Sequence, residues 1–166
     1  MAILPGRLGT LTARDVMTAQ VIVVYEQDTL ETAMATLKEH HITGAPVVDD
    51  ENRFAGIFSI SDVIPGEGRV DSLMPPLVHG DDKVTWELYD RAAPNDPQLS
   101  TDKVYSRMSQ PVTSITVNAS LVEAARVMCD GHWHRVPVVD KDGSLAGIIS
   151  TLDVLAALVN TADEPG

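Results

Sequence analysis

The chain contains one cysteine, few aromatic residues and half as many basic as acidic side chains. A lone Cys129 cannot form an internal disulfide, so folding does not depend on oxidation and a cytoplasmic setting is expected. No signal-peptide pattern opens the sequence, and no stretch approaches the ~18 apolar residues of a membrane span. The net charge of −12, from 24 acidic and 12 basic residues, repels a phosphate backbone. We therefore expect a soluble protein that binds neither membranes nor nucleic acid.

The sequence also lacks the motifs of common catalytic classes. It contains no Ser-His-Asp order, nucleophile elbow or Walker loop. Cys129 falls on an apolar-rich predicted helix, which favours a buried structural thiol over a nucleophile. With 166 residues and 44% hydrophobic content, the chain is long enough to bury a core. These features predict a globular protein that is not an enzyme.

What the chain does contain is an internal repeat. The segment Pro-Val-Val-Asp at 46–49 recurs at 137–140, an offset of 137 − 46 = 91 residues. The offset holds without a gap, and fifteen residues are identical between 17–63 and 108–154. Both segments have mixed composition, so a low-complexity match is excluded and duplication is the better explanation.

Each copy predicts the same order of elements, β-α-β-β-α. Runs of β-branched and apolar residues predict the strands 21–25, 45–48 and 54–59 in copy one and 115–117, 136–139 and 145–150 in copy two. Capping-box patterns predict the first helix after Asp28 with Glu31, and after Ser120 with Glu123. A second helix is predicted after the last strand, cut short by Pro65 in copy one and continuing to about Asn160 in copy two. The expected fold class is α/β, in two small modules.

An acidic, proline-rich insert separates the two copies. The predicted boundaries are residues 1–64 for motif one, 65–102 for the insert, 103–160 for motif two and 161–166 for a tail. The insert holds five of the ten prolines, with a short helix possible at 84–92 around Trp86. A solvated linker is favoured over a partner-binding arm, because loops vary more than the elements they connect.

The strongest functional signal is a Gly-x-x-Ser-x-x-Asp pattern where the last strand of each copy turns into a helix. Its members are Gly56, Ser59 and Asp62 in copy one and Gly147, Ser150 and Asp153 in copy two. A serine hydroxyl and the first free N–H groups of a helix suit a phosphate, and the carboxylate suits the two hydroxyls of a ribose. The glycine is expected to let a ligand approach the strand. The same spacing is close to a capping box, so a purely local role stays open.

A second signal is the pair His134-Arg135 directly before the strand 136–139. Arg135 offers the fixed cation that an acidic protein otherwise lacks for phosphate. Copy one has Thr43-Gly44 at these positions, so copy two is better equipped for an anion. A surface arginine that pairs with an acid and a histidine that covers the hairpin remain as alternatives.

With these motifs, both copies resemble cystathionine-β-synthase (CBS) motifs, and copy two is similar to repeats in the γ subunit of AMP-activated protein kinase. The resemblance implies two motifs packed sheet to sheet with pseudo-twofold symmetry and two clefts for adenosyl ligands such as AMP, ADP, ATP or S-adenosylmethionine. By position it assigns ribose to Asp62 and Asp153, ribose or phosphate to Ser59, Ser61 and Ser150, phosphate to His134 and Arg135, and adenine to Ala45 and Val136.

The sequence therefore predicts a regulatory pair of CBS motifs, a Bateman module, that senses an adenosyl ligand in the cleft between the motifs. Its other expected partners are a second copy, through the exposed helical faces, and an unidentified protein target. Two alternatives stay open. One is a ligand-free dimerisation module, and the other is a metal-binding variant in which His132 and His134 share an ion from one side of a strand.

Overall fold

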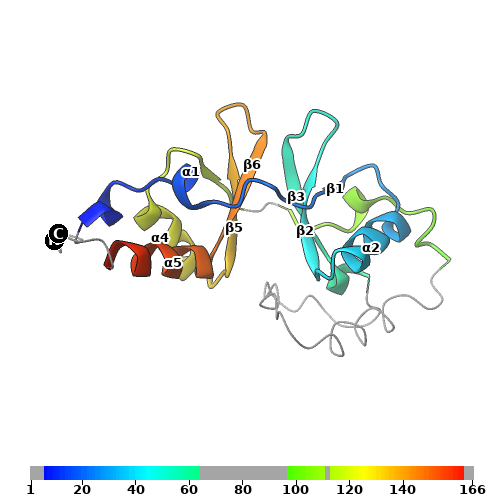
Figure 1. Ribbon diagram of the computed structural model, residues 1–166. Coiled ribbons are helices and arrows are strands. Elements are labelled where there is room, and N and C mark those ends of the chain that lie inside the picture. Colours follow the sequence, from blue (N-terminus) through cyan, green and yellow to red (C-terminus); the bar gives the residue numbers. More distant parts are fainter. Residues whose placement is uncertain (1–5, 64–96, 111–112, 163–166) are drawn as a thin grey trace. The chain divides into compact units, whose positions relative to one another are not determined.

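The structure is a computed structural model that describes residues 6–63, 97–110 and 113–162 (Figure 1). The chain divides into two compact units. The first unit comprises residues 22–112, and the second unit combines residues 1–21 with residues 113–166. Each unit contains one three-stranded sheet, so the prediction of a duplicated α/β fold is confirmed.

The first unit is built around the sheet β1-β2-β3. Its described elements are β1 (Val24–Tyr25), α2 (Leu30–Glu39), β2 (Gly44–Val48), β3 (Phe54–Ser59), the 3-10 helix η2 (Ile60–Asp62) and the 3-10 helix η3 (Val104–Ser106). Strand β2 pairs parallel with β1 and antiparallel with β3. Parallel pairing of β1 and β2 requires a crossover, and α2 provides it.

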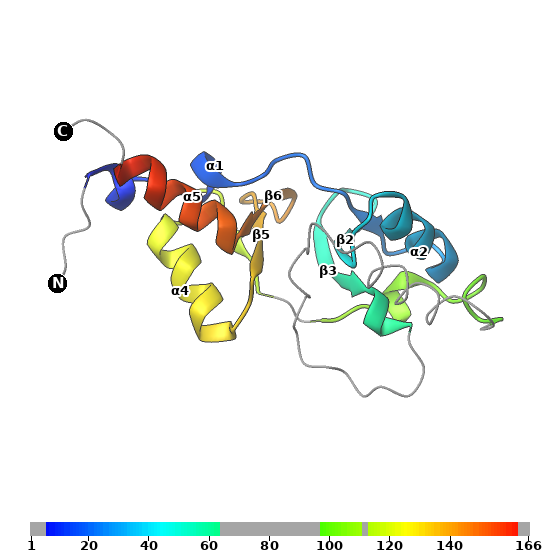
Figure 2. The same ribbon diagram turned by 60° about the horizontal axis from the view of Figure 1, so that its bottom comes forward.

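The second unit repeats this plan with the sheet β4-β5-β6. Its described elements are the 3-10 helix η1 (Gly6–Gly9), α1 (Ala13–Val16), β4 (Ile115–Thr116), α4 (Leu121–Gly131), β5 (Arg135–Val139), β6 (Leu145–Ser150) and α5 (Thr151–Ala162). Strand β5 pairs parallel with β4 and antiparallel with β6. Helices α4 and α5 lie side by side (Figure 2). The predicted order β-α-β-β-α is confirmed, although the first strands are shorter than predicted.

The N-caps of the two long crossover helices were only partly predicted. Ser120 caps α4 as expected, because its side chain accepts a hydrogen bond from the N–H of Glu123. The prediction of Asp28 for α2 was wrong: Thr29 is the cap and accepts from the N–H of Thr32. The Asp28 carboxylate instead accepts from the N–H of Tyr25, in the turn before the helix. The 91-residue offset itself aligns Thr29 with Ser120, which explains the difference.

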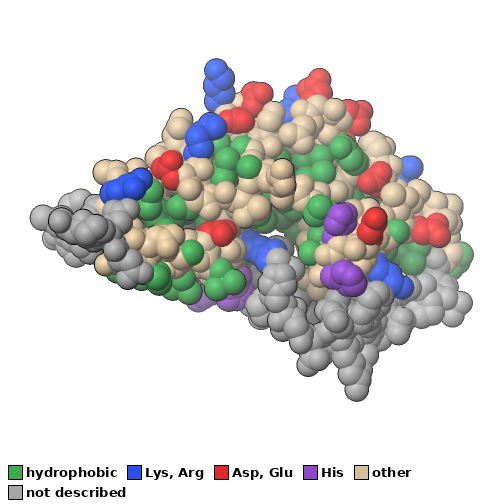
Figure 3. Space-filling view, viewed as in Figure 1, with side chains coloured by type: hydrophobic (Ala, Val, Ile, Leu, Met, Phe, Trp, Pro, Cys, Tyr) green, Lys and Arg blue, Asp and Glu red, His purple; other side chains and the backbone are tan. Residues whose placement is uncertain are grey.

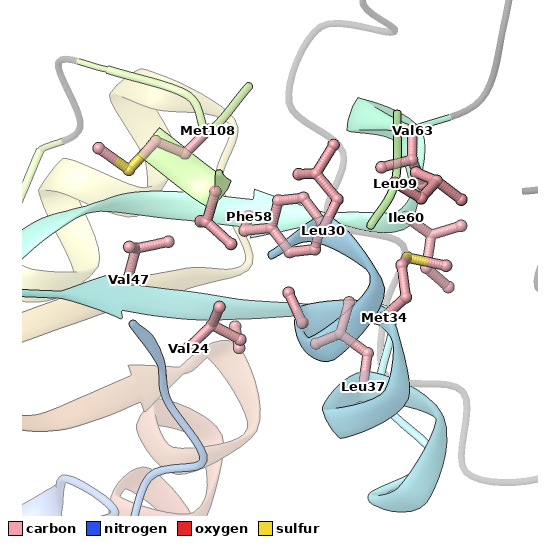
Figure 4. Close-up of a cluster of buried hydrophobic side chains, with 13 residues drawn as sticks. Val24, Leu30, Met34, Leu37, Val47, Phe58, Ile60, Val63, Leu99 and Met108 are labelled. Atoms are coloured by element: carbon pink, nitrogen blue, oxygen red, sulfur yellow. The ribbon is translucent and has the colours of Figure 1, made fainter. Parts of the chain in front are cut away.

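Each unit has its own hydrophobic core between the sheet and its helices. In the first unit, Leu30, Met34 and Leu37 of α2 meet Val47 and Phe58 of the sheet (Figure 4). The i, i+4, i+7 spacing of the helical residues places them on one face. The second unit repeats this arrangement with a core of Ala124, Met128, Val136, Val138 and Ile149, among others. One face of each sheet is therefore occupied by core packing.

The two copies of the motif exchange short segments of chain. Thr18 forms an antiparallel bridge to Ile148 on the edge strand β6, although 130 residues separate them in sequence. Ser109 bridges to Ile57 on β3 in the same way. The segment before the first strand of each copy thus completes the sheet edge of the other copy.

Part of the predicted insert is also structural. Residues 64–96, with the predicted helix at 84–92 and Trp86, lie outside the described residues. The described end of the insert packs on α2: the N–H of Glu31 donates to the carbonyl of Leu99, and Leu99 is buried. The proline and acidic residues of the insert predicted a solvated linker, so this packing against α2 was not expected. Within the described residues, no helix has the length and apolar content needed to cross a membrane.

Candidate functional site

The start of α5 brings together the site residues predicted in copy two. Arg135 on β5 pairs in register with Ser150 on β6, so the two side chains are cross-strand neighbours on one face of the sheet. The N–H of Thr151, the first residue of α5, donates to the carbonyl of His134 at 3.0 Å. The strand pairing therefore positions His134 and Arg135 at the N-terminus of a 12-residue helix.

Asp153 lies in the first turn of α5 and closes back on Ser150. Its Oδ2 accepts from the Ser150 N–H at 2.7 Å and from the Ser150 hydroxyl at 2.9 Å. The Asp153 N–H in turn donates to the Ser150 Oγ at 3.2 Å. The local capping role left open by the sequence is thus present. It uses only one carboxylate oxygen, and Oδ1 accepts none of these bonds, so capping and ligand binding are compatible.

Arg135 is the cation of this site. Its side chain is half-buried, and it makes no hydrogen bond or ion pair with any residue in the described ranges. Burial lowers the pKa of the guanidinium from its ordinary value, and the Asp153 carboxylate opposes that shift. Because arginine stays protonated at any ordinary pH, the site keeps a positive charge that is partly removed from water. Such a group favours a bound anion.

The first unit forms the same turn, but the helix that follows it is shorter. The Ser59 N–H donates to Asp62 Oδ2 at 2.8 Å, and the hydroxyls of Ser59 and Ser61 lie 2.6 Å apart. The N–H of Ile60 donates to the carbonyl of Thr43 at 2.9 Å, as the N–H of Thr151 does to His134. The structure therefore assembles Ser59, Ser61 and Asp62 as predicted, but on a three-residue 3-10 helix.

The two turns differ in charge at one register position. Gly44 pairs with Ser59 where Arg135 pairs with Ser150. A Cβ atom at Gly44 would lie 3.2 Å from the Phe58 carbonyl oxygen and 3.3 Å from the Ser59 Cβ. The first unit thus lacks the arginine and has little room for a side chain at that position.

Ala45 and Val136, the predicted adenine-lining residues, are core residues. Their side chains are 1% and 0% exposed and point to the helix-covered side of their sheets, with the other core side chains. Their contribution to a ligand site is therefore restricted to backbone N–H and carbonyl groups. The sequence could have indicated the burial of Val136, because alternate residues of a strand share a face and Val138 is also a core residue.

The two glycines of the repeated pattern have a different role from the predicted one. A Cβ atom at Gly147 would lie 2.7 Å from the carbonyl oxygen of Thr18, and one at Gly56 would lie 2.7 Å from that of Ser109. The close approach comes from the exchanged chain segments and not from a ligand. The expectation that these glycines admit a ligand is therefore wrong.

The repeated architecture can now be compared with known proteins. The family model of the CBS domain matches residues 13–65 and 103–160, which together make up more than half of the chain. The chain belongs to the CBS domain family. Both matched segments contain the Gly-x-x-Ser-x-x-Asp turn described above, so this CBS chain has two copies of the motif.

A CBS relative in plants covers most of this chain. The CBS domain-containing protein CBSX1, chloroplastic, from Arabidopsis thaliana is 30% identical over 158 residues. The alignment covers 91% of this chain and 65% of CBSX1. The chain therefore spans about two thirds of the length of that relative.

Three solved structures that are similar to this chain contain a bound ligand or metal ion. CBSX2 in complex with AMP has a TM-score of 0.62 and 26% identity, covering 90% of this chain and 96% of the other. Hypoxic Response Protein I with two coordinated zinc ions has a TM-score of 0.62 and 26% identity, covering 89% and 98%. The cytosolic domain of the magnesium channel MgtE in complex with ATP has a TM-score of 0.62 and 25% identity, covering 88% and 48%. The fold is that of CBS pairs.

The residues considered for metal binding and for a thiol role lie elsewhere than predicted. His132 is the C-cap of α4 in the left-handed conformation, with φ 54°, so it does not share a strand face with His134. In the part of the chain that the structure describes, no three His, Cys, Asp or Glu side chains form a metal-binding group. Cys129 is exposed, which contradicts the expected buried thiol. It follows Met128, the last residue of the buried face, and a turn of about 100° per residue carries it toward solvent.

Proposed function

We propose that this CBS pair is a non-catalytic regulatory module that binds an adenine nucleotide, with the phosphate held by the second unit. The observation that carries the proposal is the half-buried Arg135 side chain, which has no ion-pair partner in the described residues and lies beside Ser150 at the start of α5. An anion at this position gains the guanidinium and the N-terminal end of a 12-residue helix. The AMP and ATP complexes of other CBS proteins support this ligand class.

In this proposal the roles divide between ribose and phosphate. Asp153 holds ribose hydroxyls through the carboxylate oxygen that does not cap the helix, while Ser150, His134 and Arg135 surround the phosphate. Ser59, Ser61 and Asp62 form the corresponding ribose turn of the first unit. Backbone groups of Ala45 and Val136 contact adenine. S-Adenosylmethionine remains a candidate ligand because the ribose turn does not depend on phosphate.

The experiment compares AMP, ATP, adenosine, S-adenosylmethionine and GMP by calorimetry with wild type, Arg135→Ala and Asp153→Ala. Loss of a charge-assisted contact typically costs ~1.5–3 kcal/mol, so Arg135→Ala should weaken AMP and ATP by at least about tenfold and leave adenosine unchanged. Asp153→Ala should weaken every adenosyl ligand. Lys141→Ala is the matched control, because it removes one exposed positive charge from the β5–β6 turn of the same unit.

Two results would overturn the proposal. Binding that is unaffected by Arg135→Ala but abolished by Asp62→Ala would place the nucleotide on the first unit. Absence of binding by any adenosyl compound would leave the Ser-x-x-Asp turns as caps. The second candidate function is a ligand-free self-association module, and the exposed leucines of α5 favour it. The proposal also includes that the module regulates a protein target and works in a reducing, cytoplasmic setting.

A further inference from the structure

Met17 is the most accessible methionine in the part of the chain that the structure describes. The other three methionines there, Met34, Met108 and Met128, are 8%, 7% and 3% exposed, whereas Met17 is only half-buried. Hydrophobic side chains reach the surface at several places on the face shown in Figure 3, and partial exposure of an apolar group is ordinary. A thioether differs from those groups because an oxidant that reaches it converts it into a sulfoxide.

The Met17 side chain fills the space beside Gly147 on strand β6. A Cβ atom at Gly147 would lie 2.7 Å from the Met17 sulfur and 3.0 Å from the Met17 Cγ. Met17 also packs against the core cluster of the second unit that contains Val138 and Ile149. Gly147 and Ile149 share a face of the strand, because side chains alternate along it. The thioether therefore covers the core at a position where β6 has no side chain of its own.

The residue after Met17 fixes this segment to the edge of the sheet. The Thr18 N–H donates to the Ile148 carbonyl at 2.9 Å, and the Ile148 N–H donates to the Thr18 carbonyl at 3.0 Å. Thr18 itself is exposed. The packing of Met17 and these two hydrogen bonds thus hold the same short segment. Ile148 lies two residues before Ser150 on β6, so a change at Met17 acts close to the candidate site.

Oxidation of Met17 would remove the packing half of this attachment. Hydrogen peroxide transfers one oxygen atom to the sulfur: the O–O bond breaks, an S–O bond forms, the sulfur loses two electrons, and the other peroxide oxygen leaves as water. The sulfoxide oxygen is a strong hydrogen-bond acceptor, and burial of an unpaired polar group is unfavourable. The oxidised side chain therefore turns from the core toward solvent, and the bridge at Thr18 loses the contact beside it.

The first unit contains an internal control for this reaction. Met108 follows Met17 by the 91-residue offset of the repeat, and its sulfur would lie 3.1 Å from a Cβ atom at Gly56. Met108 is buried, however, and the side-chain amide of Gln110 donates to its sulfur at 3.9 Å. The two methionines thus make the same contact with a strand glycine, but Met17 is the one that a dissolved oxidant reaches.

We propose that Met17 is a modification site for peroxide, and that its sulfoxide releases residues 17–18 from the edge of β6. The modification is reversible, since a methionine sulfoxide reductase removes the oxygen as water while two thiols become a disulfide. The site and the release do not depend on nucleotide binding. One consequence rests on the proposed function: the oxidised protein should bind nucleotide more weakly, because the strand that carries Ser150 is less firmly held.

Graded treatment of the full-length Cys129→Ser protein with hydrogen peroxide, followed by peptide mass spectrometry, tests the site. The substitution is needed because Cys129 is exposed and would itself consume peroxide. Met17 should gain an oxygen atom at least about tenfold faster than Met108, since a buried sulfur reacts only after local opening. Equal rates for the two methionines in the folded protein would overturn the assignment of the site.

Amide hydrogen exchange tests the release. After oxidation, the Ile148 amide should exchange at least about fivefold faster, because the bridge opens more often. Met17→Leu is close in volume to methionine and inert to peroxide, so peroxide should leave its Ile148 exchange unchanged. Met108→Leu is the matched control and should respond to peroxide as the parent protein does. Complete oxidation of Met17 with no change at Ile148 would overturn the proposal.

A polar substitution provides the same test without an oxidant. Met17→Gln places an amide where the sulfoxide would be, so it should speed Ile148 exchange before any treatment. If this variant fails to fold, the peptide masses and the exchange of the oxidised parent protein still decide the proposal.

Calorimetry with AMP separates this inference from the proposed function. Oxidation should weaken AMP binding by at least about fivefold in the Cys129→Ser protein and leave it unchanged in the same protein with Met17→Leu. Unchanged AMP affinity after complete oxidation of Met17 would refute the coupling to the site. Absence of AMP binding before oxidation would contradict the proposed function instead, and Ile148 exchange would then decide the role of Met17 alone.

Discussion

Replacement of Gly147 by alanine tests the exchange of segments between the two copies of the motif. The added Cβ atom would lie 2.7 Å from the Thr18 carbonyl oxygen and 2.7 Å from the Met17 sulfur. The methionine side chain can move, but the carbonyl cannot move freely. Its oxygen accepts from the Ile148 N–H at 3.0 Å, and the Thr18 N–H donates to the Ile148 carbonyl at 2.9 Å. Relief of the clash therefore requires that the bridge open.

The expected cost follows from these two hydrogen bonds and the overpacking. Each bond contributes about 0.5–1.5 kcal/mol, and an extra methyl group in a well-packed site costs about 1–3 kcal/mol. The gain from a stiffer unfolded chain, about 0.4–1 kcal/mol for Gly→Ala, offsets part of this. We expect a net loss of roughly 1–5 kcal/mol and a melting temperature lower by about 2–20 °C.

The assay combines thermal unfolding with amide hydrogen exchange. In Gly147→Ala, the Ile148 amide should exchange faster, since the opened bridge exposes it to solvent. Gly9→Ala is the matched control, because a Cβ atom there meets nothing within 4 Å. Gly56→Ala should reproduce the effect in the first unit, where Ser109 takes the place of Thr18. A Gly147→Ala protein with wild-type stability and unchanged Ile148 exchange would refute the reasoning.

Two further predictions concern local geometry. His132→Gly should stabilise the protein by about 1 kcal/mol, because a residue with a side chain is strained in the left-handed conformation at φ 54°. His40, the C-cap of α2, has φ −92°, so His40→Gly should destabilise the protein. Equal effects of the two substitutions in thermal melts would contradict this prediction. Hydrogen bonds from Thr12 lower the pKa of Asp15 below 3.8, so its contribution is present above that pH and lost as pH falls through the lower folded value. Asp15→Asn should therefore unfold at less denaturant than wild type at pH 7, and the difference should shrink toward pH 3; a constant difference would argue against the assignment.

The repeat and its hydrophobic periodicity were enough to predict the sheets and crossover helices. The 91-residue offset aligned both hairpins, and the runs of β-branched and apolar residues placed the strands 136–139 and 145–150 within one residue of their observed bounds. The exchange of segments was not predictable in this way. Thr18 and Ile148 are far apart in sequence, and the pairing of one residue with a strand edge leaves no periodic pattern.

The site was predicted in outline but not in its packing. Sequence spacing placed Ser150, Asp153 and Arg135 near one another, and the strand register confirms that Arg135 and Ser150 are neighbours. Spacing gave no information on the space above Gly147, which a distant segment fills. The apolar-rich sequence of α4 did not indicate which side of the helix faces solvent. Cys129 was therefore predicted to be buried, whereas it is exposed.

The divergence between the copies separates what the fold requires from what a ligand would require. Positions kept identical include Gly56/Gly147, Ser59/Ser150 and Asp62/Asp153. The glycines admit an exchanged segment and the Ser-Asp pairs close a turn, so both units need them whether or not a ligand binds. Arg135 has no such structural partner among the described residues, and its counterpart is Gly44. A half-buried cation at this register position, where the first unit has Gly44, is what the proposed anion site requires.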